Sequence, residues 1–225
     1  MAHKRILILS PHADDAELGC GGYMARMIDR EGAKVLVALM TVGETASRHA
    51  GLISESERHR EFCASMALLG AEHTVLSHGM NGQMHMVPMR DFVCQLDDLQ
   101  EEFKPDTVLL PLPSSHQDHK YVWEVGLACT RPTAAKHRPD FIAAYEYPVS
   151  NWGDGAEFSV GRGGLYVNVD DHLQSKISAL KEYVSQMRGP GHLISIEGAI
   201  ALAKLRGLEA GCNYAELFHI LRVRM

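Results

Sequence analysis

Two short stretches of this sequence carry side chains of the types that can bind metals and transfer protons. Residues 11–22 read PHADDAELGCGG and place His12, Asp14 and Asp15 close together. Residues 113–119 read PSSHQDH, with two histidines around an aspartate. Histidine and aspartate are common zinc ligands, and a catalytic zinc site typically combines three protein ligands with a water molecule. Together the two stretches supply the residue types that metal-assisted hydrolysis requires.

The spacing assigns roles within these stretches. His12 and Asp15 are three residues apart in a loop that can direct both side chains toward one ion, and His119 can supply the third ligand. Asp14 is then a free carboxylate and His116 a free imidazole. Zinc lowers the pKa of a bound water to about 7. A carboxylate can take the proton as water attacks a carbonyl, while an imidazolium stabilises the oxyanion or protonates the leaving amine.

Each stretch has a simpler explanation when taken alone. Paired aspartates beside glycines suit the first turn of a helix, and HQDH suits a solvated loop. The run GCGGYMARM faintly resembles a dinucleotide fingerprint, but it lacks the G-x-G-x-x-G spacing and does not directly follow a strand. The glycines are therefore expected to allow close helix packing. The two stretches together favour a metal site, with a dinucleotide- or sugar-nucleotide-binding protein without metal chemistry as the alternative.

The elements that must position these residues follow from apolar periodicity. Apolar runs predict strands at 5–10, 34–41, 73–77, 106–112 and 141–147, with helices at about 19–31, 54–69, 88–103 and 119–130. Ser54 is expected to cap the second helix and Gly70 to end it. This alternation predicts a Rossmann-like α/β fold, with a mostly parallel sheet and helices on both faces.

The second half of the chain is less regular. It predicts a strand at 163–170, a helix at 170–187 capped by Asp170 or Asp171, a helix at 194–211 ended by Gly211, and a final strand at 215–225. The glycine-rich segment before the first of these is either an active-site cover, with Trp152 and Arg162 contacting substrate, or a plain connector. No repeat or linker interrupts the chain, so residues 1–225 are expected to form a single domain.

The predicted strands bring the two reactive stretches together. In open α/β sheets, ligands bind beyond the carboxyl ends of the strands. The stretches follow the first and fourth predicted strands, so both are expected to face one crevice.

Composition narrows the class of protein. Of the 225 residues, 46% are hydrophobic and 22% charged, as in soluble globular proteins. The net charge of −6 and the lack of a basic tract argue against nucleic acid or an anionic membrane as partner. The five cysteines form no C-x-x-C pair, so they indicate a reducing cytoplasm. Neighbours typical of helical faces, as around Cys63 and Cys94, predict that the five are buried thiols. Neither a signal peptide nor a membrane span is predicted.

With both histidine–aspartate stretches in hand, the sequence resembles the LmbE/PIG-L family of zinc-dependent N-acetylglucosaminide deacetylases, which includes the bacillithiol- and mycothiol-pathway and GlcNAc-phosphatidylinositol deacetylases. The family hallmarks are an H-P-D-D-E-type loop and a later H-x-D-H. The resemblance extends to R-x-x-E at Arg58 and Glu61, to NG at 81–82, and to KPDTVLLP, YEYPVSNW and RGLEAGCNYAELF. Ala13 and Ala16 depart from the usual proline and glutamate, but neither position supplies a required ligand.

The resemblance implies a role for eight residues. Zinc would be bound by His12, Asp15 and His119, although such ligands also suit iron(II).

The remaining five would act on the substrate. Asp14 would be the general base, His116 would stabilise the tetrahedral intermediate or act as an acid, and Asp118 would orient His116. Arg58 and Asn81 would hold sugar hydroxyls, with Asn81 standing where many family members have aspartate.

The expected function is removal of the N-acetyl group from an N-acetylglucosamine-type sugar conjugate. Cleavage of a different amide, such as one in a thiol conjugate, is the alternative that the motifs do not separate. The expected partner is a small molecule, and a homo-oligomer is compatible with such a site. The rest of the substrate depends on loops whose shape the sequence does not define.

Overall fold

A computed structural model describes residues 4–47, 51–133, 137–150 and 164–225. Its main sheet has seven strands in the order β5-β2-β1-β6-β7-β9-β8. Neighbours from β5 to β7 pair in parallel, and β9 runs antiparallel to both β7 and β8. The strands are β1 (Arg5–Ser10), β2 (Lys34–Leu39), β5 (Glu72–Val75), β6 (Thr107–Pro111), β7 (Phe141–Tyr145), β8 (Gly164–Asn168) and β9 (Ala215–Val223). The predicted mostly parallel α/β sheet is confirmed.

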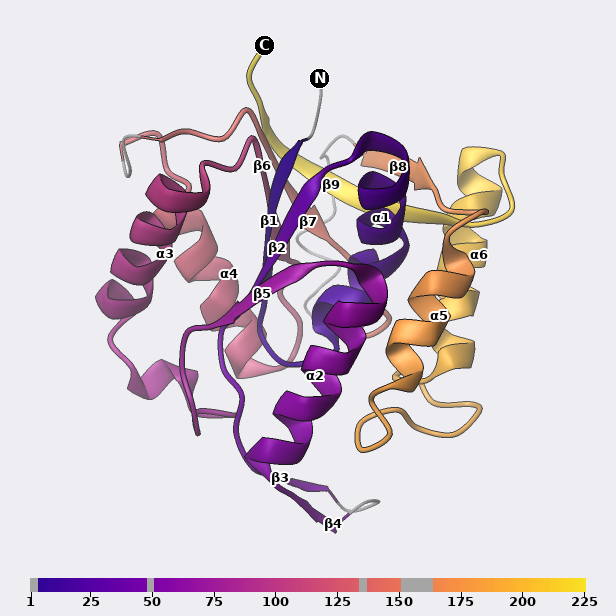
Figure 1. Cartoon of the computed structure of the whole chain (residues 1–225), viewed down its shortest axis with the longest axis horizontal. Coiled ribbons are helices and arrows are strands. Elements are labelled where there is room, and N and C mark those ends of the chain that lie inside the picture. Colours follow the sequence, from indigo (N-terminus) through magenta and orange to yellow (C-terminus); the bar gives the residue numbers. More distant parts are fainter. Residues whose placement is uncertain (1–3, 48–50, 134–136, 151–163) are drawn as a thin grey trace.

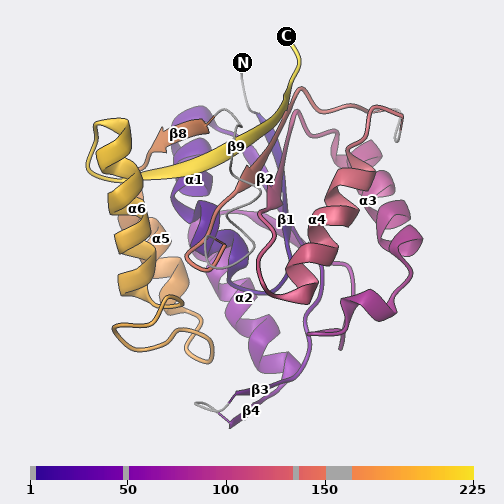
Figure 2. The same ribbon diagram turned by 180° about the vertical axis from the view of Figure 1, so that it is seen from behind.

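Helices cover both faces of this sheet (Figures 1 and 2). On one face lie α3 (Met89–Phe103) and α4 (Gln117–Cys129). On the other lie α1 (Asp15–Glu31) and α2 (Glu55–Leu69), with α5 (Leu173–Lys181) packed against both and α6 (Ile196–Ala210) outside it. A short hairpin, β3 (Thr45–Ser47) with β4 (Gly51–Ile53), and a single 3₁₀ turn, η1 (Met84–Met86), complete the described elements.

The central strand β1 explains why both faces need a helical layer. Ile6 and Ile8 pack into the core on the α1 and α2 side. Leu7 and Leu9 pack into the opposite core, against α3 and α4. Because successive side chains alternate between faces, a strand buried on both sides must be apolar throughout. The run RILILS meets that requirement.

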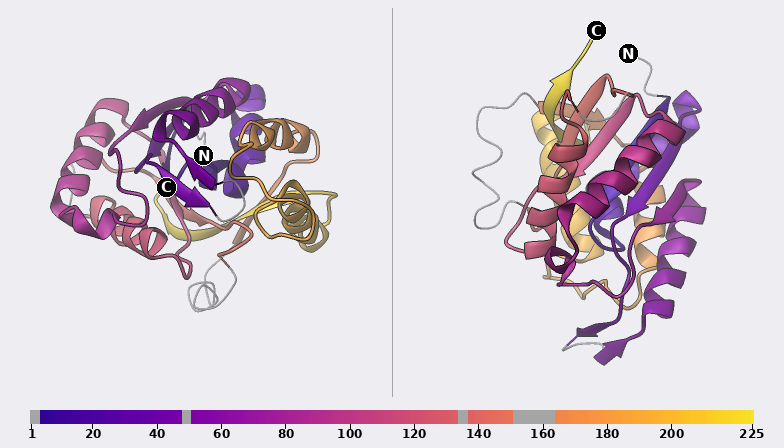
Figure 3. Two further views of the ribbon diagram at one scale, coloured as in Figure 1. Left: turned by 90° about the horizontal axis from the view of Figure 1, so that it is seen from below. Right: turned by 90° about the vertical axis from the view of Figure 1, so that its left-hand side faces the viewer.

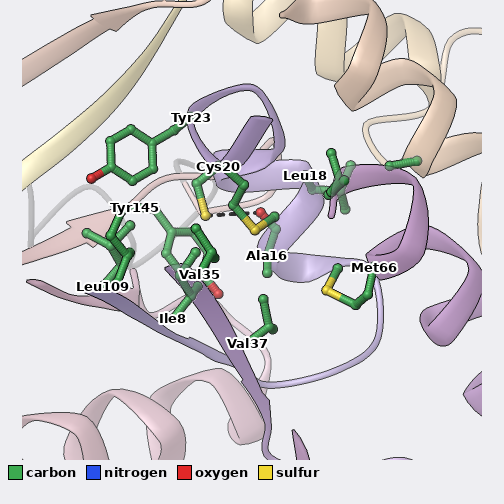
Figure 4. Packing of buried hydrophobic residues seen from close by; sticks show 14 of the residues in the cluster. Ile8, Ala16, Leu18, Cys20, Tyr23, Val35, Val37, Met66, Leu109 and Tyr145 are labelled. Carbon is green, nitrogen blue, oxygen red and sulfur yellow. Dashed lines mark hydrogen bonds between the residues drawn. The ribbon is translucent and has the colours of Figure 1, made fainter. Parts of the chain in front are cut away.

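Close packing between α1 and the sheet depends on glycine. A Cβ on Gly19 would lie 2.2 Å from the ring of Tyr145, and one on Gly22 would lie 2.9 Å from Val169. Figure 4 shows the same region, with Tyr145 beside Cys20 of α1 and the Cys20 thiol donating to the carbonyl of Ala16 at 3.1 Å. The α1 glycines are buried packing residues, as expected from the sequence, and they form no open phosphate cradle.

A break inside α1 is stabilised by a buried ion pair. The backbone leaves the helical region at Cys20, where φ is −142°. The N–H groups of Gly22 and Tyr23 donate to the carboxylate of Glu216 at 3.0 and 2.6 Å. Lys176 Nζ donates to Glu216 at 2.7 Å and to a backbone carbonyl before the break at 2.9 Å. The pair therefore satisfies the backbone groups that the break releases.

α1 begins at Asp15, four residues before the predicted start, so Asp15 is the first residue of the helix and not part of the loop. Other predicted helix ends agree with the structure. The Ser54 hydroxyl accepts the N–H of Glu57 at 3.2 Å, and Gly70 ends α2 with φ of 73°. Gly211 ends α6 in the same left-handed conformation.

The predicted boundaries of α5 were wrong. The helix is capped by His172 and neither Asp170 nor Asp171. The Asp170 carboxylate instead accepts the N–H of Tyr214 at 2.6 Å, at the start of β9. α5 also ends at Lys181, not at 187, because the chain beyond it turns to contact α2.

The five cysteines are free, and only some are buried. Cys20 and Cys129 are buried, whereas Cys63 is half-buried and Cys94 is exposed. The expectation of buried thiols is confirmed for Cys20 and Cys129 and was wrong for Cys63, Cys94 and the half-buried Cys212. Among the residues that the structure describes, no helix has the length and apolar character that a membrane crossing requires.

Candidate active site

The two reactive stretches meet at one edge of the sheet. β1 and β6 are parallel neighbours, so the loops after their carboxyl ends lie side by side. The first loop leads into α1, and the second leads into α4, with His116 as its N-cap. Figure 3 (left) views the molecule from this edge, where the β3–β4 hairpin also lies. The predicted crevice at the ends of the first and fourth strands is therefore present.

This edge contains a cavity of about 320 Å³. Its volume is at the small end of the range for small-molecule sites, about 300–1,000 Å³. Seven of the eight residues singled out from the sequence line it: His12, Asp14, Asp15, Arg58, Asn81, His116 and His119. The eighth, Asp118, is fully buried behind them.

Three donor atoms form a tight triangle in the cavity wall. Asp15 Oδ2 lies 3.3 Å from His12 Nδ1 and 3.2 Å from His119 Nε2. The two histidine nitrogens are 3.2 Å apart. Ligand bonds of 2.0–2.1 Å in a tetrahedral zinc site place the donor atoms about 3.3 Å from one another. The donor set of His12, Asp15 and His119 therefore fits a divalent metal ion.

A second, looser set overlaps the first. One nitrogen from each of His12, His116 and His119 lies within 4.8 Å of the other two, and no such group of histidine, cysteine and carboxylate side chains is found outside the cavity among the described residues. His116 Nδ1 accepts the backbone N–H of Asp118 at 3.2 Å. Both sets share His12 and His119, and they differ in whether Asp15 or His116 completes them.

Outer contacts hold the two shared histidines. His12 Nε2 is 2.9 Å from Asp118 Oδ2, and the same carboxylate accepts the N–H groups of Gly82 and Met84 at 2.6 and 3.2 Å. His119 Nδ1 contacts the hydroxyl of Tyr147. Such contacts fix the tautomer and orientation of metal-binding histidines.

The position of Asp118 corrects the sequence interpretation. Its carboxylate was expected to orient His116, but it contacts His12. Asp118 lies in the first turn of α4, where its side chain is directed toward the loop that carries Gly82. Only its backbone N–H contacts His116.

Burial and neighbouring charges shape the ionisation of this cluster. Burial alone would lower the pKa of His12, but contacts with Asp118 and Asp15 outweigh it and raise that pKa to about 9. Burial would raise the pKa of Asp15, yet the charge and hydrogen bonds of His119 and His12 hold it well below its usual value. The cluster is thus electrostatically suited to a cation between Asp15 and the histidines.

Asp14 differs from Asp15 in backbone conformation, in hydrogen bonding and in the direction of its pKa shift. Its φ of 106° is unusual for a residue with a side chain, and it makes no side-chain hydrogen bond as the cap of α1. Burial, together with the charge of Asp15, raises its pKa well above the usual value, although Arg58 opposes the shift. A carboxyl group of raised pKa is well matched to accepting a proton near neutral pH.

His116 is held in its neutral form. Burial, followed by the charges of His12 and His119, lowers its pKa to about 4. Because Nδ1 accepts a hydrogen bond from the backbone, the ring proton is on Nε2.

Arg58 and Asn81 converge on one backbone carbonyl. Arg58 Nη1 donates to the Gly43 carbonyl at 3.2 Å, and Asn81 Nδ2 donates to it at 2.8 Å. The Arg58 Nε and Asn81 Oδ1 atoms are buried without a hydrogen-bond partner. Both residues thus retain polar atoms that a ligand can satisfy.

The sequence did not predict that residues of the segment after α5 would line the cavity. Gln186 and Ile194 line it. The N–H and hydroxyl of Ser185 donate to the buried carboxylate of Glu61 at 2.8 and 2.5 Å, and Gln186 Nε2 donates to the Ser185 hydroxyl at 2.9 Å. The R-x-x-E spacing of Glu61 was the only sequence signal for this contact. Trp152 and Arg162 lie outside the described residues.

The fold and the site define an α/β protein with a candidate divalent-metal centre at the carboxyl edge of its sheet. The family model PIG-L, described as GlcNAc-PI de-N-acetylase, matches residues 7–130, more than half of the chain. The chain belongs to the PIG-L family.

Curated relatives of the chain include one bacterial and one archaeal deacetylase. It is 27% identical over 155 residues to the uncharacterized deacetylase YaiS of Escherichia coli, covering 66% of this chain and 76% of the relative. It is 24% identical over 193 residues to the diacetylchitobiose deacetylase of Thermococcus kodakarensis, covering 81% and 70%.

Solved structures share the fold over nearly the whole chain. The N,N'-diacetylchitobiose deacetylase of Pyrococcus horikoshii superposes with a TM-score of 0.75 at 22% identity, covering 97% of this chain and 84% of that one. The hydratase GalB of Pseudomonas putida gives a TM-score of 0.78 at 18% identity, covering 99% and 98%. Since a deacetylase and a hydratase share this fold, the fold alone does not assign a reaction.

Proposed function

We propose that the protein is a metal-dependent hydrolase that removes the N-acetyl group from an N-acetylglucosamine-type sugar conjugate. The single observation that carries the proposal is the geometry of the cavity wall. Donor atoms of His12, Asp15 and His119 lie 3.2–3.3 Å apart beside Asp14, a carboxylate that none of them contacts in the described hydrogen bonds. Family membership and relatives named as deacetylases support the choice of an amide as the bond that is cleaved.

His12, Asp15 and His119 would hold the metal, through Nδ1, Oδ2 and Nε2. Asp15 is preferred to His116 as the third ligand because its oxygen completes the tight triangle, whereas His116 belongs to the looser set. Zinc fits this donor set, and iron(II) also suits histidine and carboxylate ligands. When bound, such a metal acts as a Lewis acid that polarises the amide carbonyl and lowers the pKa of water.

Asp14 would act as the general base. Its carboxylate takes a proton from water as the water oxygen bonds to the carbonyl carbon of the acetamide. The protonated Asp14 then returns that proton to the amide nitrogen as the C–N bond breaks. The products are a primary amine and acetic acid, whose proton passes to the amine or to solvent to leave acetate, so protons and electrons balance without any other reactant.

His116 would stabilise the oxyanion. It is neutral, and its Nδ1 is occupied by a backbone N–H, so Nε2 presents a proton. A hydrogen-bond donor aimed at the carbonyl oxygen contributes most when negative charge develops there in the transition state. Of the two roles expected from the sequence, oxyanion stabilisation is therefore preferred to proton donation.

Arg58 and Asn81 would bind the sugar. The Asn81 oxygen can accept a hydroxyl proton, and the Arg58 guanidinium can donate to a hydroxyl oxygen. The two unpartnered atoms are buried, and a buried polar group left unsatisfied costs about 1–3 kcal/mol. A sugar that satisfies both would recover that free energy on binding.

The test is release of primary amine from a panel of N-acetylglucosaminides by the zinc-loaded protein, with His119→Ala as the blank. Release from at least one member, absent from the blank, is the expected result. If no member releases amine while acylated thiol conjugates do, the reaction is an amide hydrolysis but the sugar assignment is wrong. If neither class is cleaved by protein that holds the metal, the proposed function is wrong.

A further inference from the structure

A second group of metal-binding side chains lies away from the cavity, on α2 and β5. Cys63 Sγ is 3.6 Å from His59 Nε2 and 3.4 Å from His73 Nε2. His59 and Cys63 are one helical turn apart on α2, and His73 belongs to β5, which packs against that helix. No hydrogen-bond or ion-pair role in the candidate active site involves any of the three.

We propose that His59, Cys63 and His73 form a second site, which binds a thiophilic divalent cation of the zinc class. The two sulfur–nitrogen distances are those that such a site requires. Bonds of about 2.3 Å to sulfur and 2.0–2.1 Å to nitrogen place sulfur and nitrogen about 3.6 Å apart in a tetrahedral site. Both sulfur–nitrogen distances agree with that value to within a few tenths of an ångström.

The thiol lies between the two imidazoles, and one imidazole must move for the site to close. The three donor atoms do not all lie within 4.8 Å of one another, as those of the active-site histidines do. His73 is exposed and His59 and Cys63 are half-buried, so a small side-chain rotation is unhindered by a packed core and an ion can enter from solvent. The His73 ring packs edge-on against Phe62, with centroids 5.1 Å apart, which keeps it over α2.

The chemistry of the group favours a cation. His59 and His73 offer imidazole nitrogens and Cys63 offers a sulfur, the donor types that zinc takes in proteins. Binding replaces the thiol proton of Cys63, which passes to solvent, and the sulfur then coordinates as thiolate. Three protein ligands leave a fourth position for water.

The sulfur ligand allows metal binding at this site to be distinguished from metal binding at the active site by absorption spectroscopy. None of the described residues that line the cavity is a cysteine. A thiolate-to-metal absorption band therefore cannot arise from the active site, which offers nitrogen and oxygen donors. His59 also directly follows Arg58, so an ion here would stiffen the helix that carries this cavity residue.

The experiment is a titration of the full-length, chelator-stripped protein with Co²⁺, monitored by thiolate-to-cobalt charge-transfer absorption in the near ultraviolet. The wild-type protein is expected to develop the band with one equivalent at this site. Cys63→Ser should abolish it, and the matched control Cys94→Ser, at an exposed cysteine of α3, should retain it. His119→Ala should also retain it, because that histidine belongs to the other site.

Histidine variants distinguish a three-ligand site from a lone thiol. His59→Gln and His73→Gln should each weaken Co²⁺ binding at least tenfold while the protein stays folded. The proposal is wrong if no band forms in wild-type protein, if the band persists in Cys63→Ser, or if both glutamine variants bind as tightly as wild type. These readouts need no enzymatic activity, so they are independent of the proposed function.

Discussion

Replacement of Asp14 by asparagine tests whether Asp14 acts as the general base while the adjacent Asp15 acts as a metal ligand. Asp14 and Asp15 are the only carboxylates among the described residues that line the cavity, and Asp15 already contacts His12 and His119. No other lining carboxylate can take over proton abstraction when Asp14 is lost. We therefore expect kcat to fall by about 10²–10⁴, the usual contribution of a general base, which corresponds to roughly 3–5.5 kcal/mol.

Asparagine is the substitution that isolates this effect. It has the shape of aspartate and tolerates positive φ better than most residues, so the φ of 106° at this position need not change. Metal content should stay at the wild-type value because Asp14 is not one of the proposed ligands. The assay is steady-state amine release with metal analysis of the same sample. Activity above a tenth of wild type, or loss of the metal, would refute the assignment of Asp14 as base.

Further predictions concern the residues around the centre. Asp118→Asn should weaken zinc binding about 10–100-fold, because His12 loses its carboxylate partner. Chelator competition measures this affinity. An unchanged affinity would show that the Asp118 carboxylate does not stabilise the metal-binding position of His12. The pKa of His12, raised to about 9 in the metal-free site, means that a proton must leave when the metal binds. Apparent zinc affinity should therefore rise about tenfold per unit between about pH 6 and pH 8, and a flat profile would contradict it. Glu61→Gln should raise KM roughly tenfold with little change in kcat, because the contact that holds Ser185 and Gln186 at the cavity is weakened. An equal loss in kcat would place Glu61 in the chemistry instead.

The sheet and the reactive edge were predictable because their signals are local. Continuous apolar runs such as RILILS require burial on both faces, and that requirement fixes a central strand with helices on either side. The ends of α2 followed from Ser54 and Gly70, whose chemistry suits a helix start and a left-handed ending. The convergence of the two histidine stretches then followed from the geometry of parallel strands.

The errors arose where distant contacts decide the outcome. Asp170 has the right chemistry for a helix cap, but the turn just before β9 offers it the N–H groups of Asn213 and Tyr214, which the local sequence does not reveal. The carboxylate of Asp118 contacts His12, which is 106 residues earlier in the chain, and not its sequence neighbour His116. The Glu61–Ser185 contact spans 124 residues and shapes a cavity wall that no short motif encodes. In each case the contact joins residues that are far apart in the sequence, so the local sequence alone could not predict it.

The most direct test of the central claim is to measure amide hydrolysis against metal content in a Cys63→Ser background, which removes the proposed second site. The account predicts no amine release from metal-free protein and a linear rise to a maximum at one zinc ion per chain. Adding His119→Ala should abolish both the bound ion and the activity. Hydrolysis that survives removal of the metal, or a full equivalent of zinc retained without His119, would contradict a metal-dependent reaction at this site.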